Sequence, residues 1–176
     1  MKLELVKTHS IGQIKSGYYY LLYKWPFLWP YKGKLGDGFG YFAWRQGRPH
    51  LGIDIGDWED YGKSVIASGK GTVMFAGLSG DYGNLVVVRH GNNAGFIMES
   101  RYAHLKEIKV KRGQEVSKGA VIGKVGGWPG EYGAGRSTAP HVHFEFGLRK
   151  LISATFNWVG TYVAIDPKPL LEEAKT

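Results

Sequence analysis

The sequence predicts an all-β fold built from antiparallel strands, with few or no helices. Its apolar runs are short, rich in β-branched and aromatic residues, and bounded by Gly, Asn or Asp, which is the pattern of strands joined by tight turns. Helical periodicity is almost absent before the end of the chain, where residues 170–175 are expected to form a helical turn. Glycine is abundant, at 27 of 176 residues. Because ordinary usage is about 7%, this chain is expected to turn often.

The strands are expected to follow one another from residue 49 onward. Within 49–56, Gly52 and two isoleucines favour an extended chain over a helix. The glycine-rich segment 126–140 is expected to be a long irregular loop, a kind of segment that often carries function. The later strands are expected at 64–68, 71–76, 84–90, 96–104, near Val110, and at 120–125, 141–148 and 157–163. Turns are expected at 77–83, 91–95 and 111–118.

The length of the chain fits one globular domain with a small appendage. Residues 1–36 are expected to be an aromatic-rich lead-in, 37–169 the main domain, and 170–176 a tail. The aromatic run at 18–31 is expected to cover the core as a flap or to act as a platform for sugar rings or peptide. It is too short to span a bilayer and is broken by two prolines. We therefore expect no integral membrane segment.

Composition restricts the chemistry. The chain has no cysteine, which excludes disulfide scaffolds, thiolate metal sites and cysteine nucleophiles. Any metal ion must be held by His, Asp or Glu. The formal charge of +8 favours polyanionic partners such as nucleic acid, an acidic cell wall or an anionic membrane surface. The basic residues are scattered, without the arm or recognition helix of a nucleic-acid binder, so no nucleic-acid partner is expected.

The segment His141-Val142-His143-Phe144-Glu145 carries two of the six histidines. On a strand, side chains alternate between the two faces, so both imidazoles and the carboxylate are expected on one face, with Val142 and Phe144 on the other. Two imidazoles side by side are typical of a metal site. Glu145 is expected to orient a ligand imidazole from behind, rather than to serve as a fourth ligand.

A second pair, His50 and Asp54, is spaced so that both side chains share one face of an extended strand. Combined with the first segment, this pair supplies two or three imidazoles and one carboxylate. These ligands suit Zn²⁺ in a catalytic site, where a bound water with a pKa near 7 provides the nucleophile. The zinc-protease motif HExxH is absent. His104 is then the remaining candidate for moving protons, whereas His90, beside a turn, is expected to be structural.

A known family shares these motifs in the same order. PHLGID, IASGKGTV, GDYGNLVVVRHG, YAHL, GQEVSKGAVIG and STAPHVHFE resemble the lysostaphin/LytM-type zinc endopeptidases, which cut peptidoglycan peptides. The resemblance covers about residues 37–169 and ends in IDPKPLL. It implies an antiparallel β-sheet floor of the hybrid barrel-sandwich type, with loops walling a narrow groove.

The resemblance also implies roles for single residues. His50, Asp54 and His143 are the implied ligands of one Zn²⁺ per chain. His104 and His141 are the implied catalytic pair, which assists a zinc-bound water in attacking the amide and stabilises the oxyanion; the resemblance does not divide these two tasks between them. Candidate substrate contacts are Tyr82, Asn84, Tyr102, Ser137 and Thr138.

One residue departs from the family pattern. The usual STGPH is STAPH in this chain, so Ala139 replaces a loop glycine and has less conformational freedom. The substitution removes no ligand.

Two other functions fit part of the pattern. Two histidines and a carboxylate also hold Fe(II) in non-haem oxygenases, although that chemistry gives His104 no task. A non-catalytic cell-wall regulatory module is the other alternative, but every implied ligand and both catalytic histidines are present.

The site of action is expected to be the bacterial cell wall or periplasm, with peptidoglycan as the partner. Residues 1–17 lack the apolar stretch of a signal peptide. The sequence thus predicts synthesis in the cytoplasm, followed by release through a holin-like route or delivery in a virion. Either route fits a phage endolysin or a virion-associated lysin that lyses cells.

Overall fold

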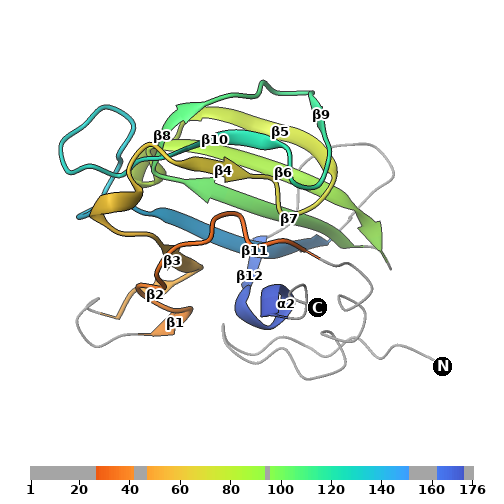
Figure 1. The fold of residues 1–176 in the computed structure, drawn as a ribbon. Helices are drawn as coiled ribbons and strands as arrows, with labels where there is room; N and C mark the ends of the chain where they lie inside the picture. Colours follow the sequence, from red (N-terminus) through yellow and green to blue (C-terminus); the bar gives the residue numbers. More distant parts are fainter. Residues whose placement is uncertain (1–26, 42–46, 94–95, 151–161, 173–176) are drawn as a thin grey trace.

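The computed structural model describes residues 27–41, 47–93, 96–150 and 162–172. Within them the fold is all-β and every strand pair is antiparallel, which confirms the predicted fold class (Figure 1). The strands are β1 (Gly40–Tyr41), β2 (Pro49–His50), β3 (Ile53–Ile55), β4 (Ser64–Ile66), β5 (Gly71–Leu78), β6 (Asn84–Asn93), β7 (Phe96–Ala103), β8 (Leu105–Ile108), β9 (Glu115–Val116), β10 (Val121–Val125), β11 (Val142–Lys150) and β12 (Tyr162–Ile165).

Three sheets form from these strands. The largest has the order β12-β11-β7-β6-β5-β9, and β3 pairs with β11 beside it. A three-stranded sheet, β4-β10-β8, lies against the larger sheet, and β1 pairs with β2 (Figure 1). The main hydrophobic cluster contains buried side chains from both the larger and the three-stranded sheet, so the core lies between them.

The two faces of the larger sheet have different chemistry. On β11, Phe144 is fully buried in the main hydrophobic cluster. His143 and Glu145, its neighbours along the strand, therefore point to the opposite face. On the adjacent β7, Tyr102 lies in the core, and Arg101 shares the opposite face with Glu145, its partner in the register. The apolar face builds the core, and the polar face carries the candidate site.

The segment 49–56 departs from the expectation of one continuous strand. β2 ends at His50 and pairs with β1, whereas β3 pairs with β11. Between them the chain bends at Gly52, where a Cβ atom would lie 2.2 Å from the carbonyl oxygen of Phe144. Only glycine allows this approach. The bend still brings His50 Nε2 within 3.1 Å of Asp54 Oδ1.

Other differences concern the ends of strands. β6 runs to Asn93, into the predicted turn at 91–95, because it stays paired with β7. β8 lies before Val110, and β9 falls inside the predicted turn at 111–118. β9 has only two residues and exists through its pairing with β5, so it leaves no periodicity in the sequence.

The end of the chain is described in part. The predicted strand at 157–163 lies mostly outside the described residues, and β12 (Tyr162–Ile165) includes its last two positions. The predicted helical turn at 170–175 corresponds to α2 (Lys168–Glu172) as far as the structure describes it. No helix in the described ranges has the length and apolar character needed to cross a membrane.

The lead-in is also described only from Phe27 onward. Phe27 is 1% exposed and belongs to the main core, where its ring contacts those of His90 and Phe146. The backbone N–H of Leu28 donates to Ser68, which ties this segment to the domain. Residues 18–26 of the aromatic run, and His9, lie outside the described residues.

His90 is part of a buried polar chain inside the core. Its Nδ1–H donates to the carbonyl of Lys70 at 2.9 Å, and its Nε2 lies 2.7 Å from the hydroxyl of Ser100, which in turn bonds Tyr102. Burial lowers the pKa of His90 to about 4, against a weaker opposing effect of the Lys70 bond. These contacts support the structural role predicted for this residue.

We expect His90 to make the fold acid-sensitive. Its pKa is about 4 in the folded state and about 6.5 when unfolded, so between these values the unfolded chain binds more protons and stability falls as pH falls. From pH 7 to pH 5 this effect lowers the free energy of unfolding by about 2 kcal/mol. Denaturant unfolding of the wild type and of His90→Gln at both pH values measures it. An equal loss in the variant would contradict the assignment.

Candidate metal centre

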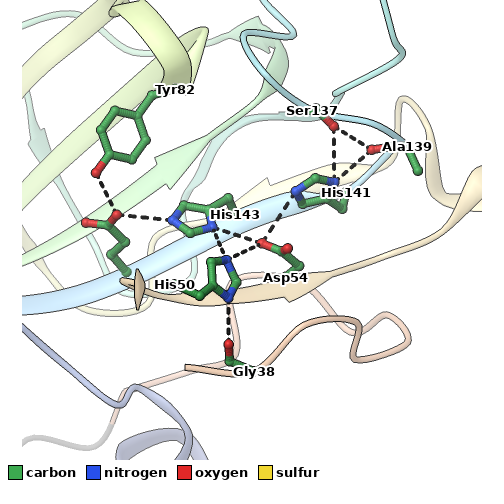
Figure 2. A network of polar contacts seen from close by, with 9 residues as sticks. Gly38, His50, Asp54, Tyr82, Ser137, Ala139, His141 and His143 are labelled. Atoms are coloured by element: carbon green, nitrogen blue, oxygen red, sulfur yellow. Dashed lines mark hydrogen bonds and ion pairs between the residues drawn. The ribbon is translucent and has the colours of Figure 1, made fainter. Parts of the chain in front are cut away.

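Three side chains from three different strands converge at one point. His143 on β11 faces Asp54 on β3, its partner in the register, and His50 arrives from the end of β2. Asp54 Oδ1 lies 2.8 Å from His143 Nδ1 and 3.1 Å from His50 Nε2, and the two nitrogens are 2.9 Å apart (Figure 2). The structure thus brings together the three residues that the sequence predicts as ligands.

The far nitrogen of each imidazole is held by a hydrogen-bond acceptor. His50 Nδ1–H donates to the carbonyl of Gly38 at 2.6 Å, and His143 Nε2–H donates to Glu145 at 3.1 Å. These bonds select the tautomers whose lone pairs point at Asp54. Three electron-pair donors therefore face one another across about 3 Å, an arrangement that a cation stabilises.

The local charge favours a cation at this point. Burial alone would raise the pKa of Asp54, but the contacts of its carboxylate with the imidazoles of His141, His143 and His50 hold that pKa well below its usual value. Burial likewise opposes protonation of His143, yet the bonds to Asp54 and Glu145 raise its pKa to about 9, so without a cation a proton on Nδ1 occupies the direction that a metal ion would use. The two carboxylates thus place strong negative potential around the ligand atoms.

The donor set fits a metal ion. The ligand atoms of His50, Asp54 and His143 all lie within 4.8 Å of one another. Two imidazoles and one carboxylate are a set found in mononuclear catalytic metal sites, which leave a position open for substrate or water. These residues can hold one metal ion.

His141 approaches the same point from the end of the long loop. Its Nδ1–H donates to the carbonyl of Ala139 at 2.7 Å, and the hydroxyl of Ser137 lies 3.2 Å from the same nitrogen. The opposite nitrogen, Nε2, lies 3.4 Å from Asp54 Oδ1 (Figure 2). His141 therefore presents a lone pair beside the ligands and has the position of a proton acceptor.

His104 occupies the break between β7 and β8. Its φ of 59° is the only positive φ of a non-glycine residue in the described part of the chain. Its ring lies 4.9 Å from that of His141 and 5.9 Å from that of His143, between centroids. Burial, followed by the nearby His141 and His143, lowers its pKa to about 3. Its buried Nδ1 has no hydrogen-bond partner among the described residues.

Glu145 is anchored behind His143 by several groups. It is fully buried and accepts from the hydroxyl of Tyr82 at 2.7 Å. Its second oxygen lies 3.5 Å from Arg101, whose guanidinium stacks 3.5 Å from the centroid of the Tyr162 ring. Burial raises the pKa of Glu145, but His143, Tyr82 and Arg101 outweigh it and lower that pKa. Glu145 is therefore an ionised acceptor.

The loops around the site are joined closely. Asn84 N–H donates to the carbonyl of Gly133 at 2.7 Å, and Arg136 N–H donates to Asp81. At Gly83, whose φ is 63°, a Cβ atom would lie 2.0 Å from the same Gly133 oxygen. This contact holds the 79–84 turn against the long loop that ends in His141.

The predicted substrate contacts have different positions. Thr138 is exposed, and Ser137 is half-buried and bonds the Ala139 carbonyl. Asn84 donates its side-chain amide to Leu105, and Tyr82 is bound to Glu145. Tyr102 is 0% exposed.

The expectation for Tyr102 is wrong. Its hydroxyl is bonded in the core to the backbone of Ser68 and to Ser100, so it cannot touch a substrate. Side chains alternate between the two faces along β7. Arg101 points to the polar face, so Tyr102, the next residue, points into the core.

The replacement of glycine by Ala139 leaves the loop unstrained, since Ala139 has no positive φ. Sequence reasoning missed Arg101, which contacts Glu145, and the two residues that lie against Arg101, namely Glu99 and Tyr162. Along β7, Glu99 and Arg101 alternate with core residues, so both side chains point to the polar face that carries the site. The contact of Arg101 with Glu145 depends on the pairing of β7 with β11.

Residues 48–155 match peptidase family M23. The DD-carboxypeptidase/endopeptidase Mpg of Neisseria meningitidis is 42% identical over 98 residues, which are 56% of this chain and 20% of that protein. The peptidoglycan DD-endopeptidase ShyA of Vibrio cholerae is 40% identical over 101 residues, 57% of this chain and 21% of that protein. The chain thus spans about a fifth of the length of these relatives.

Solved structures show the same fold. The catalytic domain of the antimicrobial peptidase lysostaphin from Staphylococcus simulans is similar with a TM-score of 0.58 and 31% identity, covering 80% of this chain and 92% of that one. A zinc containing peptidase from Vibrio cholerae is similar with a TM-score of 0.58 and 30% identity, covering 75% and 41%.

An antiparallel β fold that carries two imidazoles and a carboxylate beside two further histidines is that of a metallopeptidase. The family match covers more than half of the chain. The chain belongs to peptidase family M23, which confirms the resemblance to lysostaphin found from the motifs.

Metal binding is expected to stabilise the fold through these ligands. A divalent ion such as Zn²⁺, at 100 times its dissociation constant, is expected to add about 2.7 kcal/mol to the free energy of unfolding of chelator-treated protein. Asp54→Ala is expected to abolish this gain, because it removes the only anionic ligand. Thermal unfolding with and without the ion measures the effect. Glu59→Ala, which removes an exposed carboxylate, is the control, and an equal loss in both variants would contradict the site.

Proposed function

We propose that the chain is a zinc-dependent endopeptidase that hydrolyses peptide bonds in the stem peptides or cross-bridges of peptidoglycan. The observation that carries this proposal is the convergence of His50, Asp54 and His143 within 4.8 Å, with His141 Nε2 3.4 Å from the shared carboxylate. Relatives named as peptidoglycan DD-endopeptidases support the substrate class.

Zinc is favoured over iron by the neighbouring groups. Two histidines and a carboxylate suit either metal. However, amide hydrolysis requires groups that take up and donate protons, and His104 and His141 stand beside the ligands. Oxygen chemistry would leave both without a task. The similar Vibrio cholerae structure is described as a zinc containing peptidase.

The metal ion, His141 and His104 each have a separate role in the proposed hydrolysis. When bound, zinc supplies Lewis acidity, which lowers the pKa of water and polarises a carbonyl. His141, with Nδ1–H tied to Ala139, accepts a proton at Nε2 and returns it to the leaving amine. His104 has a buried Nδ1 without a partner in the described ranges, and it donates a hydrogen bond to the oxygen that gains negative charge.

Glu145 acts through His143. By accepting from His143 Nε2–H, it keeps the Nδ1 lone pair directed at the metal position. Arg101 and Tyr82 hold the carboxylate in place from two further directions. We assign Glu145 as a positioning residue and not as a fourth ligand.

The lytic role extends this proposal to the cell. Cleavage of cross-links in the wall would weaken it and lyse the bacterium. The Ser137 and Thr138 pair, in the loop that ends at His141, is proposed to contact the peptide. Release by a holin-like route, or delivery in a virion, stays a prediction from the sequence.

Loss of His141 is expected to stop catalysis while metal binding persists. His141→Ala is expected to lower kcat/KM on purified muropeptides by 100-fold or more, on the order of the contribution of one general base. Zinc content by mass spectrometry is expected to stay at one ion per chain, because His141 is outside the ligand set. His90→Gln is the control for loss of a buried histidine elsewhere.

The same experiment separates the alternatives. Intact muropeptides after incubation with the zinc-loaded wild type would overturn the endopeptidase assignment. Stoichiometric iron with oxygen-dependent turnover would favour the oxygenase. A cellular effect unchanged in His141→Ala would favour a regulatory module.

Glu145→Gln is expected to weaken zinc binding by about 10- to 100-fold, because the amide is a poorer acceptor for His143 and removes a negative charge. Competition with a chromophoric chelator measures the affinity. The matched control is Glu99→Gln, a second fully buried carboxylate near Arg101 that has no contact with His143 among those described. Equal zinc affinity in Glu145→Gln and the wild type would contradict the positioning role.

A further inference from the structure

Three aromatic side chains form an exposed cluster beside the metal centre, which we call the aromatic corner: Trp58, Tyr61 and Trp128. Trp58 is 55% exposed and Trp128 is 46% exposed. Their rings meet at 4.9 Å between centroids with an angle of 83°, and the Tyr61 ring lies 5.4 Å from Trp128 at 71°. In such an edge-to-face contact, the ring that presents its edge keeps its faces free of that contact.

The aromatic corner is held in place by polar contacts. The hydroxyl of Tyr61 donates to the carboxylate of Glu131, and Lys106 Nζ lies 4.1 Å from the centroid of the Tyr61 ring. Two backbone bonds join its two segments, from Gly62 N–H to Val125 and from Val125 N–H to Lys63. The rings are therefore positioned before any ligand arrives, which lowers the entropic cost of binding.

Both segments of the aromatic corner lead directly out of the metal centre. Trp58 lies in the short helix η2 (Trp58–Asp60), four positions after Asp54. Trp128 follows Gly126, which forms a β-bridge with His141. In Figure 1 the golden turn of η2 and the teal loop after β10 lie at the same edge of the molecule. The corner is thus continuous with the rim of the site.

We propose that the aromatic corner binds a pyranose ring of the glycan strand to which the peptide substrate is attached. This inference rests on the proposed function. Peptidoglycan consists of peptides linked to chains of N-acetylated sugars, so a ligand that places its peptide at the metal centre carries sugar rings close by. The apolar C–H face of a pyranose stacks on an indole, and its hydroxyl and acetamido groups meet charged partners at the rim.

The rim of the corner matches that ligand. Lys106 is a donor and Glu131 an acceptor, and both already lie against Tyr61. Large exposed aromatic groups next to a site are typical of binding surfaces, where one side of the ring is apolar and the edge is wet.

A soluble tetramer of N-acetylglucosamine tests the proposal. Binding to the full chain is followed by tryptophan fluorescence and by the indole N–H signals in NMR. Trp58→Ala and Trp128→Ala are each expected to weaken binding by about tenfold, the scale of one lost aromatic contact. The matched control is Tyr132→Ala, which removes an aromatic side chain that is 79% exposed in the same loop, and its affinity is expected to equal that of the wild type.

The outcomes separate this inference from the proposed function. Binding is expected to survive chelation of the metal, because the corner supplies no ligand to it. Absence of tetramer binding by the wild type, or equal affinity in all variants, would overturn the sugar site even if peptide cleavage is intact. Displacement of the tetramer by a sugar-free stem peptide would overturn it in favour of a peptide subsite. Tetramer binding by a protein that cleaves no muropeptide would count against the endopeptidase alone.

Discussion

The pairing of β11 with β3 on one side and with β7 on the other determines the chemistry of the site. Its register sets His143 opposite Asp54 and Glu145 opposite Arg101. A slip of one residue would turn these side chains into the core and bring Phe144 to the site. The packing of Phe144 and its neighbours between the two sheets therefore also holds the ligands in position.

This arrangement concentrates charge on a buried surface. Glu145 and Glu99 are fully buried, and Asp54 is largely so. Arg101 lies between the two glutamates and balances part of that charge. The remaining negative potential is directed through His143 and Asp54 toward the ligand atoms. Because an unpaired buried charge is costly, the site favours a bound cation on energetic grounds as well as through geometry.

Much of the site could be predicted from the sequence because alternation along one strand is a local rule. It places His141, His143 and Glu145 on one face, and the structure agrees. The strands near the middle of the chain were also predictable from their apolar runs. The same rule applied to 49–56 reaches the correct pair, His50 and Asp54, although the segment is bent at Gly52.

Long-range contacts could not be predicted in this way. Asp54 and His143 are separated by 89 positions, and only the register of β3 against β11 brings them together. Because the pairing of strands cannot be derived from the sequence pattern, Tyr102 was wrongly predicted to contact substrate, and the contact of Arg101 with Glu145 could not be predicted. The two-residue strand β9 is likewise created by its partner and not by its own propensity.

His104 shows how local preference and function oppose each other. A non-glycine residue in the left-handed region costs about 1–2 kcal/mol, and φ at His104 is 59°. The strands on either side hold His104 in this conformation. β7 stays paired with β11 up to Ala103, whereas β8, which begins at Leu105, pairs with β10 in the other sheet. The N–H of His104 also donates to Tyr82, whose hydroxyl anchors Glu145. The change of sheet thus turns the imidazole toward the ligands, and the packing of two sheets supplies the energy that the strained backbone requires.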